Sequence, residues 1–320
     1  MTPTSPPGPE TNVAVVGAGS VGTSFALVFA LAGRNVRLHD PDPARREAAP
    51  RTIEARLADL AEFGLTREPA AETLRRIAIE ADLADVVEGA SYVQECAPEN
   101  LELKRGVFAE LDAVAEPNTI LASASSAIPA SRFAAELAGR RRCLVVHPGN
   151  PPTLIKVAEV VPADFTAPEI VERTMNFLRS CGSAPILVKR EVEGFVFNRL
   201  QGALLREAYC LVRDGVSSVE DIDRIVRDGL GLRWSVVGPF ETVDLNTRGG
   251  IASHAEKMGP AYERMGAERG QHDPWTPDLV AKVAAERRGL LPLENWEERV
   301  AWRDRMLMGL LAQRRAGRDS

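Results

Sequence analysis

The sequence has little of what binds metals or cross-links a chain, with four cysteines and four histidines among 320 residues. The cysteines lie far apart, so they form none of the close pairs that zinc or a redox dithiol requires. A histidine-rich metal site is equally disfavoured. We therefore expect no metal, and we expect reduced, buried thiols in a cytoplasmic protein. The cysteines are Cys96, Cys143, Cys181 and Cys210.

Long hydrophobic runs and an excess of either charge are also lacking. Gly, Arg or Asp interrupts each apolar stretch before it reaches the roughly 20 residues that cross a bilayer, so we expect no transmembrane helix and no membrane partner. Basic side chains number 39 and acidic ones 45, and the net charge of −6 disfavours nucleic acid as a partner. No basic stretch followed by an apolar run opens the chain, and residues 1–11 are expected to form a disordered tail.

The composition that remains is that of a globular protein. Apolar residues make up 45% of the chain and charged residues 26%, which is enough to bury a core and excludes a disordered scaffold. Because 320 residues exceed most single compact domains, about two domains are expected.

Short β-branched runs alternate with helical patterns from Val13 onward, as in parallel strands joined by crossover helices. The first helical pattern, over 20–32, ends at Gly33, which suits the left-handed position that closes a helix. The runs with strand character are VAVVG, NVRLHD, RIAIE, SYVQEC, TILASAS and CLVVHP. They predict an α/β domain with a Rossmann-type doubly wound sheet.

After His147 the turn NPPT is short enough for the next run, KVAEVVP, to pair antiparallel with the strand before it. A helix over 168–180 and the strand PILVK follow. This hairpin sets side chains of two neighbouring strands beside one another.

Beyond about Glu193 only helical spacing remains. Ser217 and Glu220 form a capping box that marks a further helix start. We therefore expect an α/β domain over 12–190 and an all-helical C-terminal domain over 191–320.

A G-x-G-x-x-G motif stands between the first predicted strand and the first predicted helix. Gly17 permits the tight turn, Gly19 leaves room for a pyrophosphate, and Gly22 allows close packing of helix on strand. The first N–H groups of the helix, at Ser20 and Val21, then face the phosphates. Because glycines are common in turns, a Gly-rich turn in another doubly wound protein is the alternative.

Asp40 ends the second predicted strand, about twenty residues beyond the motif, where a carboxylate accepts both ribose hydroxyls of the adenosine. It would repel the 2′-phosphate of NADP, and Pro41, Asp42 and Pro43 supply no adjacent cation. NAD is therefore the predicted cofactor.

His147 ends the CLVVHP run, at the edge of a parallel sheet where ligands collect. Glu159 follows on the next strand, within hydrogen-bonding reach if NPPT turns the chain back. Such a carboxylate would fix the imidazole tautomer and stabilise the imidazolium, which makes His147 a base for a hydroxyl proton. The alternative is a histidine satisfied by a backbone carbonyl and a glutamate on a solvated strand face.

Several segments together resemble the 3-hydroxyacyl-CoA dehydrogenase family. In the expected order they are QECAPENLELKRGVF, LASASS, HPGNPP with a glutamate twelve residues after its histidine, EGFVFNRL and GPFETVDLN. The resemblance covers about residues 12–265. HPGNPP, DGLGLRW and GPFETVDLN are most similar to the lambda-crystallin branch, the L-gulonate 3-dehydrogenases.

The resemblance implies an NAD-dependent dehydrogenase whose catalytic pair is His147 and Glu159. It also implies that Ser126 and Asn198 contact the reacting oxygen. The alternatives are that Ser126 caps a helix near Pro129 and that Asn198 holds its own helix end.

Glu99 and Lys104 match family positions near the nicotinamide ribose, although an exposed charge pair at this spacing is the alternative. The resemblance further implies a homodimer through the helical domain. A partner subunit would then be able to complete the substrate pocket.

Two departures from the family pattern bear on the substrate. Ala124 replaces an asparagine in the strand before Ser126, and Pro148 and Gly149 replace phenylalanines after the histidine. Both changes move away from acyl-CoA enzymes, and the lambda-crystallin branch shares Pro148.

Arg233, in GLGLRW, resembles an arginine specific to that branch. A guanidinium facing the cleft would hold the carboxylate of a small substrate in a bidentate pair. The alternative is a surface arginine stacked on Trp234.

The predicted function is therefore NAD-dependent oxidation of the 3-hydroxyl of a small anionic hydroxy acid such as L-gulonate. An L-3-hydroxyacyl-CoA dehydrogenase or a carnitine dehydrogenase is the alternative within enzymes. The alternative from another class is a non-catalytic, NAD(H)-binding structural or sensing protein of the crystallin type.

Overall fold

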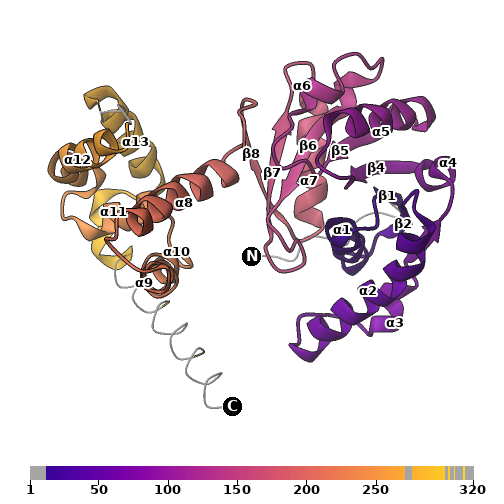
Figure 1. Ribbon diagram of the computed structural model, residues 1–320, viewed down its shortest axis with the longest axis horizontal. Coiled ribbons are helices and arrows are strands. Elements are labelled where there is room, and N and C mark those ends of the chain that lie inside the picture. Colours follow the sequence, from indigo (N-terminus) through magenta and orange to yellow (C-terminus); the bar gives the residue numbers. More distant parts are fainter. Residues whose placement is uncertain (1–11, 271–275, 300–301, 303–305, 307–312, 314–320) are drawn as a thin grey trace. The chain divides into compact units, whose positions relative to one another are not determined.

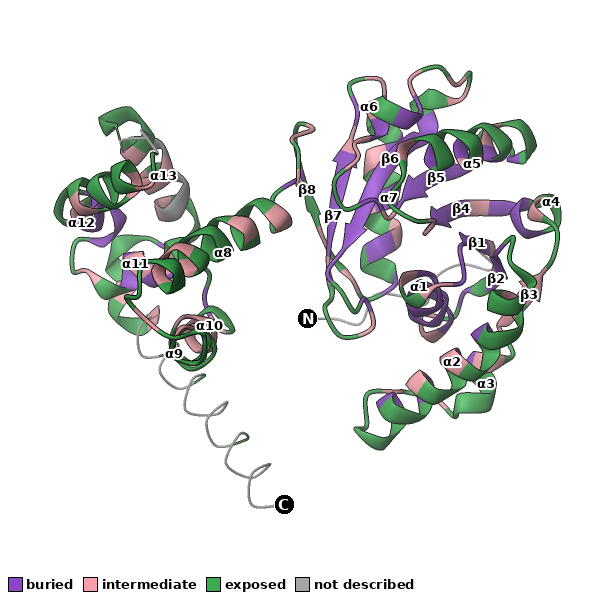
Figure 2. Cartoon of the chain, viewed as in Figure 1, coloured by how far each residue is buried: buried purple, intermediate pink, exposed green. Residues whose placement is uncertain are grey.

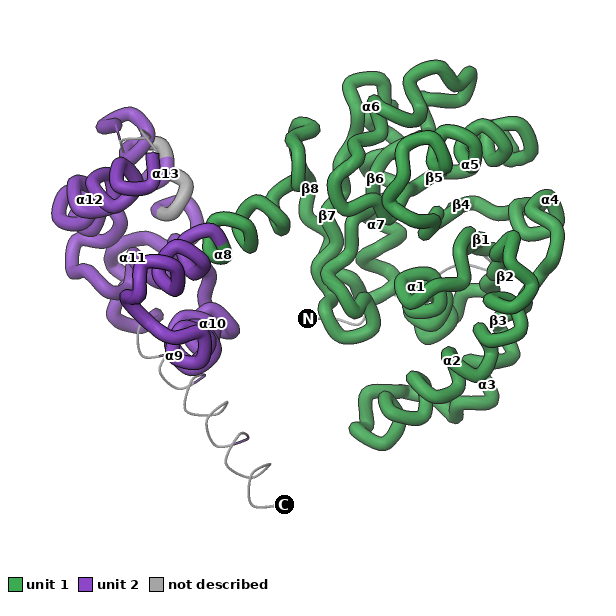
Figure 3. The backbone as a smooth tube through the Cα atoms, viewed as in Figure 1, with its two compact units in different colours: residues 1–205 green, residues 206–320 purple. Residues whose placement is uncertain are grey.

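The computed structural model describes residues 12–270 and 276–299, together with 302, 306 and 313. The expected tail, residues 1–11, lies outside the described residues. The chain forms two compact units, residues 1–205 and 206–320 (Figure 3). The division falls inside a helix, later in the chain than the boundary near residue 190, which stays a prediction.

The first unit is built on one eight-stranded sheet with the order β3-β2-β1-β4-β5-β6-β7-β8 (Figure 1). Neighbouring strands are parallel except β6 and β7, which are antiparallel. The doubly wound sheet and the turn back at NPPT are thus confirmed. The strands are β1 (Asn12–Val16), β2 (Asn35–His39), β3 (Ile77–Glu80), β4 (Ala90–Glu95), β5 (Ile120–Ser123), β6 (Cys143–Pro148), β7 (Val157–Pro162) and β8 (Ala184–Leu187).

Helices of the first unit begin and end at residues suited to those positions. Gly33, at φ 79°, closes the first helix as predicted. Asp42 accepts a hydrogen bond from Ala44 N at the start of the second, where Pro43 is the first helical residue. The helices are α1 (Ser20–Leu31), α2 (Pro43–Glu62), α3 (Ala70–Leu74), α4 (Leu83–Val87), α5 (Leu101–Val114), α6 (Ala130–Phe133) and α7 (Pro168–Ser180).

Two apolar layers cover the two faces of this sheet, because successive strand residues point to opposite sides. Helices α1, α2 and α7 pack over one face, where Val13 and Val15 of β1 lie. Helices α4, α5 and α6 pack over the other face, with Ala14 and Val16. Figure 2 shows the buried residues concentrated in the strands between these helices.

The strand order reverses at β1, which lies between β2 on one side and β4 on the other. The crossover connections leave β1 and β4 in opposite directions, and this opens a crevice at their carboxyl ends. Ligands of doubly wound sheets bind in that crevice.

The second unit is helical throughout its described residues, as the sequence predicts. Its first capping residue is Ser218, whose Oγ accepts from Asp221 N at 3.1 Å, so the predicted Ser217–Glu220 box was wrong by one position. Helix α8 (Phe197–Arg213) spans the division between the units. The others are α9 (Val219–Arg224), α10 (Gly231–Trp234), α11 (Pro239–Asn246), α12 (Gly250–Glu268) and α13 (Pro277–Leu290), with a π-helical segment (Ile225–Leu230) before α10.

All four cysteines are free. Cys143 and Cys181 are buried as expected, whereas Cys96 and Cys210 are only partly buried. Burial raises the pKa of the Cys143 thiol to about 12, so this thiol stays protonated and unreactive. None of the described helices combines the length and the apolarity that crossing a membrane requires.

A buried ion pair lies beneath the ends of β4 and β5. Lys104 of α5 is fully buried, and its Nζ donates to Glu95 Oε1 and Oε2 at 2.9 and 3.0 Å. Ser123 Oγ donates to the same carboxylate, and Ala97 N donates to Glu95 Oε1 at 2.6 Å. The charges are therefore paired and hydrogen-bonded, which is the condition under which a protein interior tolerates them.

We predict that Lys104→Met lowers the free energy of unfolding by about 3–5 kcal/mol, because Glu95 would be left as an uncompensated buried charge. Urea unfolding followed by circular dichroism measures the change. Glu102→Gln on the same helix is the control, since it removes an exposed pair with Arg105 that is worth about 0–1 kcal/mol. Equal effects of the two substitutions would contradict the prediction.

Candidate active site

The Gly-rich loop has a conformation that only glycine accommodates at two positions. Gly17 has φ 108°, and a Cβ there would stand 2.8 Å from the backbone carbonyl of Cys96. A Cβ on Gly22 would overlap the carbonyl oxygen of Gly17. The loop therefore passes tightly between β1, β4 and α1, at the crevice of the sheet.

The third glycine, Gly19, faces open space instead. A Cβ built on it meets only Arg45 Nη1, at 3.9 Å. Gly19 is the N-cap of α1, it offers no side-chain cap, and the first turn carries no acidic residue. The first N–H groups, including those of Ser20 and Val21, are thus left for an anion such as a pyrophosphate. This loop fits the diphosphate of NAD.

Arg56 of α2 holds that first turn in place. Its guanidinium donates to Ser20 O and Oγ, to Thr23 Oγ1 and to Ser24 Oγ, at 2.6–2.9 Å. No periodic pattern in the sequence predicts this contact, because the donor and the acceptors belong to different helices.

Asp40 is buried at the end of β2, with both carboxylate oxygens engaged. Oδ2 accepts from Ala18 N at 2.8 Å and Oδ1 from Asp42 N at 3.0 Å. Pro41, Asp42 and Pro43 supply no cation, but α2 brings Arg45 Nη1 to 4.0 Å from Asp40 Oδ2. Asp40 stays the predicted ribose ligand.

His147 and Glu159 meet across the antiparallel strands. They are paired residues in the β6–β7 register, and His147 Nδ1 lies 2.7 Å from Glu159 Oε2. The side chain of Glu159 is 1% exposed and that of His147 is 9% exposed. The solvated-face alternative is therefore wrong, because both groups are buried against one another.

The second oxygen of Glu159 binds the start of α8. Oε1 accepts from Val196 N at 2.8 Å and from Phe197 N at 2.9 Å. Burial acts to raise the pKa of Glu159, but the hydrogen bonds from His147 and from these N–H groups outweigh it and leave the pKa below its usual value. The carboxylate is thus ionised near neutral pH, and it can only accept.

Two aromatic rings that sequence reasoning missed flank the imidazole. The ring centroids of Phe195 and Phe197 lie 5.8 and 6.2 Å from that of His147. Phe195 is fully buried and has a φ of 49°, unusual for a side chain of this size. The segment EGFVFNRL contained the signal, but the residues alone did not indicate which of its phenylalanines faces the histidine.

Ser126 and Asn198 lie in direct contact. Asn198 Nδ2 donates to the backbone oxygen of Ser126 at 2.9 Å, and this contact lies within the first unit. Ser126 does not cap α6, whose N-cap is Pro129 without a side-chain bond. Ser125 instead serves the turn, since its Oγ accepts from Ile128 N at 2.8 Å.

Glu99 fastens the loop that carries Ser126. Burial acts to raise the pKa of Glu99, and hydrogen bonds from the loop lower it below its usual value. An exposed Glu99–Lys104 pair is wrong, because Lys104 is buried on Glu95. The donors to Glu99 are Ser125 Oγ at 2.6 Å and the N–H groups of Ser126, Ala127 and Ile128 at 3.0–3.1 Å.

Arg233 lies in α10 of the second unit and is half-buried. Its Nε has no hydrogen-bond partner among the described residues. A buried guanidinium N–H without an acceptor is energetically costly.

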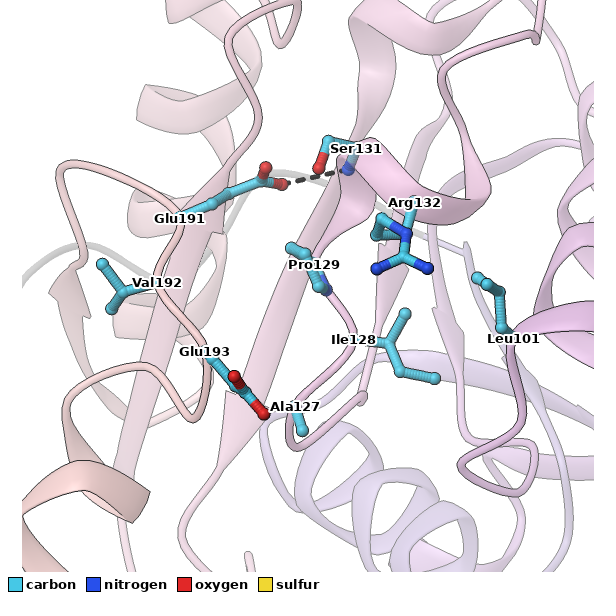
Figure 4. Close-up of a pocket in the computed structure, with 9 residues that line it drawn as sticks. All are labelled: Leu101, Ala127, Ile128, Pro129, Ser131, Arg132, Glu191, Val192 and Glu193. Carbon is cyan, nitrogen blue, oxygen red and sulfur yellow. Dashed lines mark hydrogen bonds between the residues drawn. The ribbon is translucent and has the colours of Figure 1, made fainter.

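A cavity of about 570 Å³ adjoins the segment that follows Ser126 (Figure 4). Ser131 N donates to Glu191 across its upper edge at 3.0 Å, as the dashed line in Figure 4 marks. None of the predicted site residues lines it. The lining residues are Leu101, Ala127, Ile128, Pro129, Ser131, Arg132, Glu191, Val192 and Glu193.

The described residues contain no group of three or more His, Cys, Asp and Glu side chains arranged for a metal ion. A phosphate-binding glycine loop, an acid at the end of β2 and a buried histidine–carboxylate pair on the same sheet are instead the parts of a dinucleotide-dependent dehydrogenase.

Comparison with known proteins identifies the family. Residues 12–192 match the family described as 3-hydroxyacyl-CoA dehydrogenase, NAD binding domain, and residues 194–289 match its C-terminal domain. The chain belongs to the 3-hydroxyacyl-CoA dehydrogenase family and is an NAD-dependent oxidoreductase. The predicted family and cofactor are confirmed.

Individual relatives cover nearly the whole chain. A lambda-crystallin homolog of Bos taurus is 41% identical over 302 residues, which are 93% of this chain and 94% of the relative. An L-carnitine dehydrogenase of Streptomyces griseus is 38% identical over 277 residues, 86% of this chain and 79% of the relative. The solved structure of 5-formyl-3-hydroxy-2-methylpyridine 4-carboxylic acid 5-dehydrogenase, an NAD+-dependent dismutase, matches with a TM-score of 0.72 at 30% identity, covering 94% of this chain and 99% of that one.

We predict that Glu159 makes stability depend on pH below about 4.5. Its pKa is lower folded than unfolded, so its contribution is present above the unfolded pKa and is lost as the pH falls through the folded pKa. The free energy of unfolding, measured by urea titration, should therefore fall more steeply with acidification in the wild type than in Glu159→Gln, by up to about 1.4 kcal/mol per pH unit. Glu54→Gln, at an exposed position of α2, serves as the control and should keep the wild-type slope.

Proposed function

We propose that the chain oxidises the 3-hydroxyl of a small hydroxy acid, L-gulonate or a compound like it, with His147 as the base. The observation that supports this proposal is the buried 2.7 Å hydrogen bond between His147 Nδ1 and Glu159. An ionised carboxylate accepts and does not donate, so Nδ1 carries the hydrogen and Nε2 is left as the basic nitrogen.

The proposed chemistry uses this tautomer. Bound NAD supplies the hydride acceptor, C4 of its nicotinamide. His147 Nε2 takes the hydroxyl proton while the hydroxyl-bearing carbon loses its hydride, and Glu159 stabilises the imidazolium that forms. The rings of Phe195 and Phe197 flank the imidazole and give it apolar neighbours.

Ser126 and Asn198 are proposed to donate to the substrate oxygen. Asn198 uses one N–H for the backbone of Ser126 and keeps a second for the substrate. The Ser126 hydroxyl lies on a loop whose backbone Glu99 holds with three N–H bonds. Donors held in advance stabilise the charge that develops on the oxygen. We also propose a role near the nicotinamide ribose for Glu99 and Lys104. Lys104 would act there indirectly, through its hydrogen bonds to Glu95 and Ser123.

Arg233 is proposed as the ligand of the substrate carboxylate, since a guanidinium N–H without a described acceptor suits an anion. Pro148, Gly149 and Ala124 depart from the acyl-CoA enzymes at the positions around the base. A carboxylate beside a 3-hydroxyl is common to L-gulonate and L-carnitine, so the L-carnitine dehydrogenase relative makes carnitine the second candidate.

Three further expectations stay proposals. They are a cytoplasmic location, a homodimer through the helical domain, and a domain boundary near residue 190.

A substrate panel with NAD tests the proposal. Initial rates with L-gulonate, 3-hydroxybutyrate, L-carnitine and 3-hydroxybutyryl-CoA should be highest for a free hydroxy acid. Arg233→Met should reduce kcat/KM for that acid by about tenfold to a hundredfold, the value of a charge-assisted hydrogen-bond pair, with a smaller effect on the CoA ester. Preference for the CoA ester would contradict the proposal, and NADH binding without turnover on the panel would favour the non-catalytic alternative.

His147→Gln should lower kcat by at least about a hundredfold, because glutamine keeps a polar group in place but cannot take the proton. The dissociation constant for NADH, followed by fluorescence, should change little, since the cofactor loop is on β1 and α1. An unchanged kcat would remove His147 from the mechanism.

A further inference from the structure

Arg45 is a cation that the chain places at the adenosine end of the cofactor site. It lies in the first turn of α2, and its side chain is 53% exposed. Nη1 lies 4.0 Å from Asp40 Oδ2, and Nε lies 3.8 Å from Asp42 Oδ2. These distances are at the outer limit of an ion pair, and exposed pairs of this kind contribute little, so the guanidinium is available to a ligand.

The same guanidinium lies beside the Gly-rich loop. Its Nη1 is the nearest atom to a Cβ built on Gly19, at 3.9 Å. Arg45 therefore lies between the glycine that the pyrophosphate approaches and the acid that faces the adenosine ribose. A phosphate on the ribose 2′-oxygen would therefore lie close to both Asp40 and Arg45.

Two other arginines near Asp40 and the Gly-rich loop, Arg46 and Arg56, already donate hydrogen bonds within the protein. Arg46 Nη1 donates to the backbone oxygen of Asp40 at 2.6 Å and to that of Pro41 at 3.2 Å. Arg56 is bound to Ser20 and its neighbours in α1. Of these three arginines, Arg45 is the one whose side chain contacts only carboxylates among the described residues.

Asp40 cannot move aside for an anion. Its carboxylate is held by Ala18 N and Asp42 N at 2.8 and 3.0 Å and is buried. A 2′-phosphate carries a charge of about −1.5 to −2 at neutral pH, so it would meet a fixed like charge beside the attraction of Arg45.

We propose that Arg45 is a specificity-determining residue, the cationic half of a latent site for 2′-phosphorylated dinucleotides, and that the fixed charge of Asp40 opposes binding at this site. Removal of that charge, with the volume retained, removes the repulsion, leaves the attraction of Arg45 and lets the enzyme bind NADPH. The proposal concerns the cofactor end of the site, so it does not depend on which substrate is oxidised.

Binding measured by fluorescence titration tests it without any substrate. Asp40→Asn should bind NADPH at least about tenfold more tightly than the wild type does, because a charge-assisted hydrogen bond replaces a repulsion. Adding Arg45→Ala to that variant should remove the gain. Adding Arg51→Ala, an exposed arginine of the same helix, should change NADPH binding by less than about twofold.

Three outcomes would overturn the proposal. They are an Asp40→Asn variant that binds NADH but gains no affinity for NADPH, a gain that survives Arg45→Ala, and an equal loss with Arg51→Ala. If Asp40→Asn fails to fold, Arg45→Ala in the wild-type background replaces it. The ratio of the NADPH and NADH dissociation constants should then rise about tenfold, and an unchanged ratio would overturn the proposal.

Discussion

The carboxylate of Glu159 is the contact on which the histidine site depends. One oxygen binds the imidazole of His147, and the other accepts both N–H groups at the start of α8. A single buried charge therefore sets the orientation of the base and anchors the helix that carries Asn198. This double use explains why the carboxylate stays ionised although it is almost fully buried, because each lone pair that faces the protein has a donor.

The cofactor end relies on the backbone more than on side chains. Positive φ at Gly17, tight packing at Gly22 and the uncapped start of α1 create an anion site without a lysine. Side chains support this backbone arrangement. Arg56 holds the first turn of α1, and Asp40 connects β2 to the loop by accepting from Ala18 N. The two ends of the site are therefore built by different means on one sheet, and the crevice at its strand reversal brings them to the same edge.

Much of the fold and of the candidate site was predictable from the sequence, and the features that were not predictable share one cause. Strand runs, the helix over 20–32 and the pairing of His147 with Glu159 follow from local spacing and one short turn, so the sequence carries them. The partner of Lys104 does not follow, because Glu95, Glu99 and Glu102 are all within reach along the chain and only the fold decides among them. Arg45 was missed for the same reason, since its position depends on the direction in which α2 leaves β2. The predicted capping box at Ser217 was wrong because Ser217 and Ser218 are adjacent and carry the same hydroxyl group. The pattern does not show which of the two caps the helix.

The burial of Glu159 has a consequence for the route that protons take. The Nδ1 side of the imidazole ends at a carboxylate that is sealed from water, so no exchange with solvent occurs through it. In the proposed reaction a proton picked up by Nε2 has one exit, the face from which it arrived. In each turnover the organic product would then have to leave before His147 loses this proton, so product release would precede proton release.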